Sequence, residues 1–189
     1  KHTIEFCKKL IKRNLKIYFV IETHLRILDT ELIRLLKESG LKGVKVGVES
    51  YDENVLQESG RFTVTKDEQF NKIRELERNN IQISAMYILG FPTDNEITIK
   101  KTIDYAKKLN TTYAQFSIWT PYPGTPVFKE YEDKIIADKF DNFDQYHLVY
   151  KHNLFDKKTI RKYLSKAYSV YYLRINWLYK YFKSFLYSK

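Results

Sequence analysis

The chain has 189 residues, of which 43% are hydrophobic, so it is long enough for one domain with a buried core and an extension. It has no apolar run of about eighteen residues, which argues against a membrane-spanning helix. Its only cysteine, Cys7, excludes a disulfide framework or a cysteine-held metal cluster built from this chain alone, and favours a cytoplasmic protein. The formal net charge of +10 is concentrated near the carboxyl end.

Hydrophobic periodicity predicts helices and strands that alternate along the first 120 residues. We expect a helix over 3–13, a strand over 17–22, a helix capped by Asp29 and closed by Gly40, and a strand over 43–49. A short helix over 52–59 and a helix opened by a Thr65–Glu68 capping box follow. Next come a strand over 81–89, a helix that begins with a second capping box at Thr93, and a strand over 113–119.

This alternation predicts an α/β fold with parallel βαβ units. The strands are continuous apolar runs, as expected when both faces of a sheet are covered. A closed eight-stranded barrel needs about 250 residues, so the strands predicted here indicate a partial (β/α) TIM-like barrel or an open sheet. We assign residues 1–130 to this partial barrel. Residues 131–189 form an irregular segment and a C-terminal helical extension that begins at about Asp156.

Residues 151–189 contain ten Lys or Arg residues and one acidic residue, together with many aromatic residues. Three interpretations of this tail are open, in order of preference. The helix packs an apolar stripe on the barrel and solvates its lysines. Alternatively, it lies on an anionic membrane surface through Trp177, Tyr179, Phe182 and Phe185, which would make the protein peripheral to the membrane. The third interpretation is that it binds nucleic acid by phosphate neutralisation and stacking.

Polar residues or Gly/Pro punctuation follow three of the predicted strands. Glu49 and Ser50 end one strand, Gly90-Phe91-Pro92 ends the next, and the last is followed by Thr120-Pro121-Tyr122-Pro123-Gly124-Thr125-Pro126. Ligand sites in parallel α/β folds form at the carboxyl ends of the strands. We therefore expect these segments to share one cleft.

In this order, Gly47-Val48-Glu49-Ser50, Ile88-Leu89-Gly90-Phe91-Pro92 and the Thr120–Pro126 segment resemble the second half of the barrel of radical S-adenosylmethionine (radical SAM) enzymes. The resemblance is greatest to members that have a cobalamin-binding domain. Arg26, Leu28 and Asp29 also fit an Arg-x-Leu-Asp pattern that follows the third barrel strand of the family. The resemblance extends from about residue 3 to about residue 130.

The resemblance implies that Glu49 and Ser50 contact the ribose and amino-acid portion of S-adenosylmethionine. A carboxylate suits ribose hydroxyls or an ammonium group, although an ion pair with a nearby Lys or Arg is the alternative. Arg26 is implied to face the cofactor carboxylate, with a plain surface salt bridge as the alternative.

The strand-five motif of the family, Gly-x-Ile-x-Gly-x-x-Glu, is implied to orient adenine. Ile88 and Gly90 match it, whereas Met86 and Thr93 stand where Gly and Glu are expected. We interpret Thr93 as a helix cap. The sixth strand is implied to supply backbone contacts near Trp119 and Thr120, and Trp119 either stacks on adenine or is a core residue.

The chain departs from the family in lacking the Cys-x-x-x-Cys-x-x-Cys motif that holds the [4Fe-4S] cluster. In the family, reductive cleavage of S-adenosylmethionine at this cluster gives a 5′-deoxyadenosyl radical, which functionalises an unactivated carbon of a small-molecule substrate. We predict that this chain is a fragment, inactive alone, of a parent that supplies the remaining half-barrel and, in one version, a cobalamin-binding domain that supports methylation. The alternative is a non-enzymatic module whose tail contacts RNA or an anionic membrane.

Overall fold

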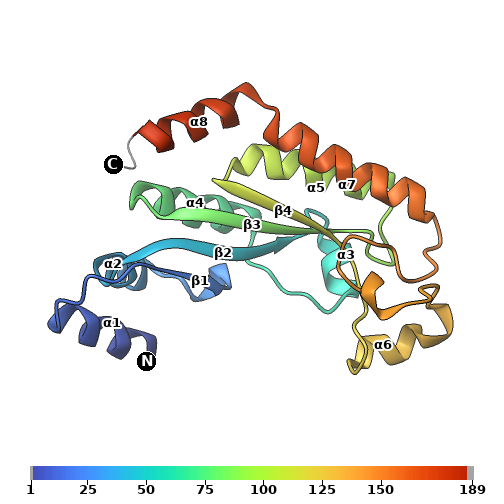
Figure 1. Cartoon of the computed structure of the whole chain (residues 1–189), viewed down its shortest axis with the longest axis horizontal. Helices are drawn as coiled ribbons and strands as arrows, with labels where there is room; N and C mark the ends of the chain where they lie inside the picture. Colours follow the sequence, from blue (N-terminus) through green and yellow to red (C-terminus); the bar gives the residue numbers. More distant parts are fainter. Residues whose placement is uncertain (1, 187–189) are drawn as a thin grey trace.

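Four parallel strands form one sheet in the order β1–β2–β3–β4 in the computed structural model, which describes residues 2–186 (Figure 1). The strands are β1 (Phe19–Thr23), β2 (Leu41–Glu49), β3 (Gln82–Leu89) and β4 (Tyr113–Ile118). Each neighbouring pair is parallel and is joined by a helical crossover. The predicted α/β fold with sequential βαβ units is therefore confirmed.

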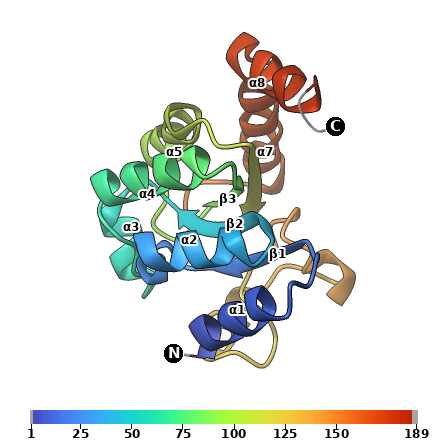
Figure 2. The same cartoon turned by 90° about the vertical axis from the view of Figure 1, so that its left-hand side faces the viewer.

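Helices cover one face of this sheet. These are α2 (Thr30–Glu38), α3 (Glu53–Glu58), α4 (Lys66–Arg78) and α5 (Glu96–Leu109), and Figure 2 shows them on the same side when the strands are viewed end on. Strand residues that face them, such as Val46, Tyr87 and Phe116, are fully buried. The opposite face carries exposed or half-buried residues, among them Lys45 and Met86. The result is a curved half-barrel with a largely open inner face.

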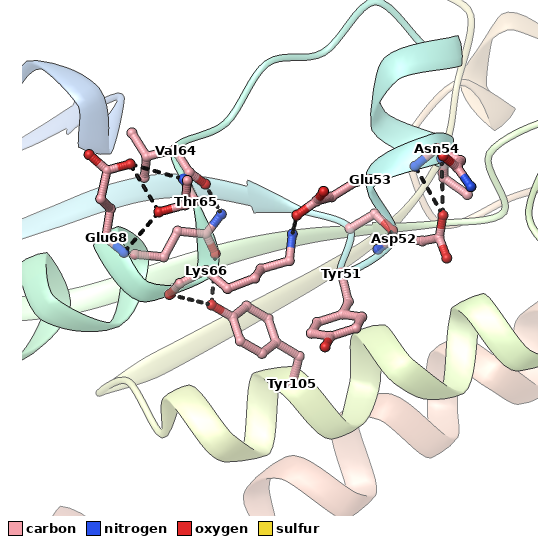
Figure 3. Close-up of polar contacts among 12 residues, drawn as sticks. Tyr51, Asp52, Glu53, Asn54, Val64, Thr65, Lys66, Glu68 and Tyr105 are labelled. Carbon is pink, nitrogen blue, oxygen red and sulfur yellow. Dashed lines mark hydrogen bonds and ion pairs between the residues drawn. The ribbon is translucent and has the colours of Figure 1, made fainter.

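The helix starts follow from capping side chains. Asp29 accepts a hydrogen bond from the Leu32 amide at 2.8 Å, and the predicted Thr65–Glu68 capping box is present at the start of α4 (Figure 3). The prediction that Thr93 caps α5 is wrong. Asn95 is the N-cap, and its side chain bonds the amides of Ile97 and Thr98.

The C-terminal extension contains two helices, not the single long helix predicted from the sequence. These are α7 (Lys157–Tyr172) and α8 (Ile175–Leu186). The Arg174 side chain lies at the break, where its Nε donates to the Tyr171 carbonyl at 2.8 Å and its Nη1 donates to the Lys107 carbonyl at 2.7 Å. Arg174 therefore satisfies a terminal carbonyl of α7 and ties the junction to the end of α5.

Helix α7 covers the free edge of β4 with tyrosine hydroxyls. The Tyr168 hydroxyl accepts from the Phe116 amide at 3.1 Å and donates to the Phe116 carbonyl at 2.8 Å. Tyr172 makes the same pair of bonds with Ala114 at 3.0 and 2.8 Å. Four helical residues rise about 6 Å and two strand residues about 6.6 Å, so the two spacings match. Side chains thus block the edge from pairing with another strand.

The packed interpretation of the tail is confirmed for α7. Its residues Ile160, Leu164, Ala167 and Tyr171 are buried in the core shared with the sheet. The other elements of the described chain are two helices and three 3-10 turns. The helices are α1 (His2–Lys12) and α6 (Pro126–Tyr131), and the turns are η1 (Leu25–Ile27), η2 (Glu132–Lys134) and η3 (Phe140–Asn142). Within residues 2–186, no helix is long and apolar enough to cross a bilayer.

Candidate functional site

Glu49 ends β2 in an unusual backbone conformation. Its φ is +66°, in the left-handed region that non-glycine residues rarely adopt, and the β2–β3 register shifts between Gly47 and Glu49. The turn folds the side chain back over the strand, so that a Cβ at residue 47 would lie 2.5 Å from Glu49 Oε1. A side chain at position 47 would displace this carboxylate. Such local strain is often found at functional sites.

The partner of the Glu49 carboxylate is Arg61, whose Nη1 lies 3.0 Å from Oε2. The Glu49 side chain is only 17% exposed. Burial raises the pKa of Glu49, while the positive charge of Arg61 and the nearby His24 oppose that rise. The ion-pair alternative is thus realised here, although a monodentate pair of this kind leaves Oε1 available to a ligand.

Ser50 is placed differently from Glu49. It is 1% exposed, and its hydroxyl lies 3.2 Å from Thr102 Oγ1 on α5 and accepts from the Asp52 amide at 3.2 Å. The hydroxyl therefore points to the helical side of the sheet and holds the turn after β2. The structure brings Glu49 but not the Ser50 side chain to the open face.

Ile88 lies half-buried on β3, opposite Ser117 of β4 and one strand away from Glu49. Gly90 follows at the end of β3 with a φ of +73°, and a Cβ there would lie 3.1 Å from Ile160 Cδ1. Its carbonyl accepts from the Tyr150 hydroxyl at 2.8 Å. Gly90 thus turns the chain at the rim where close packing against α7 leaves no room for a side chain.

Trp119 sits at the end of β4, where its amide donates to the Leu89 carbonyl at 2.9 Å. Its ring is 8% exposed and packs edge to face on Tyr131 at 5.0 Å and Tyr150 at 4.9 Å. Thr120 follows and donates to the Ile118 carbonyl at 3.0 Å. Most of the indole ring therefore packs within an aromatic cluster, and only its exposed edge is open to a ligand.

A groove of about 480 Å³ lies along these strand ends. Its walls come from the loop after α3, the turn after β3, the segment after β4 and helix α6: Glu58, Ser59, Gly60, Arg61, Pro92, Thr93, Trp119, Thr120, Pro121, Tyr122, Thr125, Val127, Glu130 and Tyr131. The segments that follow β3 and β4 share this groove, as expected, whereas Glu49 and Ser50 at the end of β2 do not line it. Arg61, which pairs with Glu49, connects the end of β2 to the groove. A single cleft that includes the end of β2 therefore stays a prediction.

Arg26 lies outside this groove. It is exposed on η1 after β1, where its amide donates to His24 Nδ1 at 3.1 Å. Within residues 2–186, its guanidinium forms no salt bridge, so the surface salt bridge considered from the sequence is absent there. Its role toward the cofactor carboxylate stays a prediction.

Sequence reasoning missed Arg61, Tyr131 and Tyr150. Arg61 follows Gly60 in a loop without periodicity, so nothing in the local sequence points to a contact with Glu49. Tyr131 and Tyr150 belong to the irregular aromatic segment, and only their contacts with Trp119 assign them to the site.

A second concavity lies on the helical side of the sheet, between α3 and α4. Lys66 extends across it toward Glu53 at 3.8 Å and lies 5.3 Å from the Tyr51 ring centroid, as Figure 3 shows. The Tyr105 hydroxyl donates to Gln69 Oε1 at 2.9 Å. These polar groups bond to one another within the protein. We therefore interpret this concavity as a gap between packed helices and not as a binding site.

Within residues 2–186, no three His, Cys, Asp or Glu side chains gather closely enough to hold a metal ion. Cys7, on α1, is buried with 0% exposure. The described residues therefore offer no ligand set for a metal cluster.

A parallel half-barrel with helices on its outer face and a groove at the carboxyl ends of its strands is typical of the (β/α)-barrel fold. Residues 1–106 match the family model of the radical SAM superfamily. The chain belongs to the radical SAM superfamily, as its motifs predicted.

Curated relatives include enzymes several times longer than this chain. An uncharacterized methyltransferase, PH0819, of Pyrococcus horikoshii is 28% identical over 92% of this chain and 38% of its own length. The anaerobic magnesium-protoporphyrin IX monomethyl ester cyclase of Rubrivivax gelatinosus is 31% identical over 79% of this chain and 26% of its own length. The chain thus spans about a quarter to two-fifths of these relatives. They favour an enzyme over a non-enzymatic binding module.

Solved structures share the fold. The radical SAM methyltransferase TsrM from Kitasatospora setae, with cobalamin and a [4Fe-4S] cluster bound, has a TM-score of 0.63 and 20% identity over 70% of this chain and 28% of its own. Coproporphyrinogen III oxidase (HemN) from Escherichia coli has a TM-score of 0.62 and 13% identity over 89% of this chain and 36% of its own. These likenesses confirm the predicted partial TIM-like barrel.

Proposed function

We propose that this chain supplies the ribose and adenine side of an S-adenosylmethionine site in a radical SAM enzyme that functionalises an unactivated carbon. The observation that carries the proposal is Glu49, held in a left-handed conformation at the end of β2 with its carboxylate above Gly47. A carboxylate fixed in this way is a preorganised acceptor for two neighbouring hydroxyl groups.

The surrounding residues fit the rest of the cofactor. Ile88 offers a half-buried apolar surface next to Glu49 for the adenine ring, and the backbone at Trp119 and Thr120 borders the groove. Ser50 contributes through its backbone, since its hydroxyl is bonded to Thr102. The exposed Arg26 attracts the cofactor carboxylate from the adjacent strand end.

The residues described here do not fit the cluster, because they offer no set of thiolate ligands. We therefore assign the [4Fe-4S] cluster to a Cys-x-x-x-Cys-x-x-Cys motif elsewhere in a longer parent, and propose that this chain alone does not cleave S-adenosylmethionine. The cluster and the cofactor, when bound, supply the radical chemistry, whereas this chain orients the nucleoside. We also propose that the parent has a cobalamin-binding domain and works in the cytoplasm on a small-molecule substrate.

The test is S-adenosylmethionine binding by the complete parent protein, reconstituted anaerobically with iron and sulfide. We expect Glu49→Gln to weaken binding by about tenfold to a hundredfold and to lower the yield of 5′-deoxyadenosine, because the loss of one charged hydrogen bond is worth about 1.5–3 kcal/mol. The matched control is Glu31→Gln, an exposed carboxylate of α2 on the helical side of the sheet. Equal affinities of the Glu49 variant and the wild type would contradict the assignment.

A further inference from the structure

Helix α8 carries an apolar face that nothing in the described part of the chain covers. Ile175 is 83% exposed, Leu178 38%, Tyr179 69% and Phe182 61%. Their spacing of three, one and three residues places them on one stripe of the helix. Four large exposed side chains on one stripe are far more than the scattered apolar residues of an ordinary surface.

The opposite side of α8 is fixed to the domain, so this exposure does not come from a detached helix. Trp177 Nε1 donates to the Thr112 carbonyl at 2.9 Å, and its ring packs edge to face on Tyr172 at 4.7 Å. Arg174 bonds the end of α5 through the Lys107 carbonyl. The Trp177 side holds the helix in place and the Ile175–Phe182 stripe faces outward.

The charge around this stripe has one sign. No acidic residue follows Asp156 in the sequence. Residues 174–186, which comprise α8 and the residue before it, contain three basic residues and no acidic one. An apolar stripe beside a basic surface is the pattern of helices that lie in the interface of anionic membranes.

We propose that α8 docks on the surface of a membrane that contains anionic phospholipid, with Ile175, Leu178, Tyr179 and Phe182 among the acyl chains. Charge favours this occupant over a second copy of the chain. A second copy of the chain carries the same positive tail and would repel it, whereas lipid phosphates attract it. Nucleic acid would use the basic residues and could stack on Tyr179 and Phe182, but it would gain nothing from the exposed Ile175 and Leu178.

The position of α8 leaves the cofactor groove open. Helix α7 runs antiparallel to β4, because Tyr168 bonds Phe116 whereas Tyr172 bonds the earlier Ala114. α8 therefore lies at the amino ends of the strands, at the end of the molecule opposite α6 (Figure 1). A membrane bound there would orient the protein without covering the groove.

The test is flotation of the complete parent protein, which contains any other segment that would cover α8, with vesicles of phosphatidylcholine alone or mixed with phosphatidylglycerol. We expect partition into the mixed vesicles only, and a loss of about tenfold or more for Phe182→Ser, because burial of a large side chain is worth about 1.5–3 kcal/mol. Phe62→Ser, at an aromatic residue 78% exposed on another surface, is the matched control and should bind as the wild type does. Circular dichroism should show that both variants remain folded, since both side chains are exposed.

Three outcomes would overturn the proposal. One is the absence of binding to phosphatidylglycerol vesicles. Another is equal binding by Phe182→Ser and the wild type, which would mean that charge alone accounts for the binding and that the apolar stripe does not enter the membrane. The third is a concentration-dependent dimer that dissociates in Phe182→Ser, which would make the stripe an interface between copies.

Discussion

The Glu49 carboxylate lies over Gly47, and a Cβ at residue 47 would come within 2.5 Å of Glu49 Oε1. This relationship joins two residues of the sequence motif Gly47-Val48-Glu49-Ser50 in space. The carboxylate occupies the space that a Cβ at residue 47 would fill, and Arg61 holds it there through the ion pair with Oε2. The conformation of Glu49 depends on both neighbours.

Gly47→Ala should therefore weaken S-adenosylmethionine binding but leave the free energy of unfolding nearly unchanged. The new Cβ displaces the flexible end of Glu49, so S-adenosylmethionine affinity of the complete enzyme should fall by about tenfold. The free energy of unfolding should change by less than about 1 kcal/mol, because alanine also reduces the entropy of the unfolded chain. Calorimetric titration and urea unfolding measure the two quantities. Unchanged affinity would show that Glu49 need not occupy this position.

Ser50→Ala should give the opposite result. The buried hydroxyl bonds Thr102 and the Asp52 amide, so its loss should cost about 1–2 kcal/mol of unfolding free energy. Affinity for S-adenosylmethionine should stay within about twofold of the wild type, because the hydroxyl faces the helices. A large loss of affinity at unchanged stability would show that the Ser50 side chain contacts S-adenosylmethionine.

The contribution of each tyrosine hydroxyl on the edge of β4 to the free energy of unfolding should be measurable separately. Tyr168→Phe leaves the Phe116 amide and carbonyl without a partner, and Tyr172→Phe does the same at Ala114. Each change should lower the free energy of unfolding by about 1–3 kcal/mol and speed amide exchange at the strand residue concerned. The control is Tyr179→Phe, whose ring is 69% exposed and which should stay within about 0.5 kcal/mol. Equal stabilities for all three variants would contradict this account of the edge.

Asp94 should make stability depend on pH. Burial raises the pKa of Asp94 from 3.8 to about 6, although the Thr98 hydroxyl at 2.6 Å and the Phe91 amide at 3.0 Å lower it. The folded protein holds this proton more tightly than the unfolded chain. Its stabilising contribution is therefore complete below pH 4 and is lost as pH rises from about 4 to about 6.

Asp94→Asn removes this titration. Between pH 4 and pH 7 the wild type should lose about 2–3 kcal/mol of unfolding free energy relative to the variant. Urea unfolding at several pH values gives this difference directly. A difference that stays constant over the range would mean that Asp94 titrates normally in the folded protein.

The sequence by itself determined the order of helices and strands, because apolar periodicity and capping residues such as Asp29 and Thr65 act within a few residues. It also located Glu49, Gly90 and Trp119 at strand ends, since parallel strands bring those ends to one edge of the sheet. The α5 cap was mispredicted at Thr93 because Asp94 bonds the Phe91 amide and the Thr98 hydroxyl, and Asn95 takes the capping position.

Only the tertiary structure decided which way the polar groups at these ends face. The Ser50 hydroxyl turns to Thr102, 52 residues away, and Tyr168 reaches Phe116 across another 52 residues. The break before α8 likewise depends on Arg174 reaching the Lys107 carbonyl, 67 residues away. Contacts between distant residues leave no periodic trace in the sequence, because they form only after the sheet has brought its crossovers together.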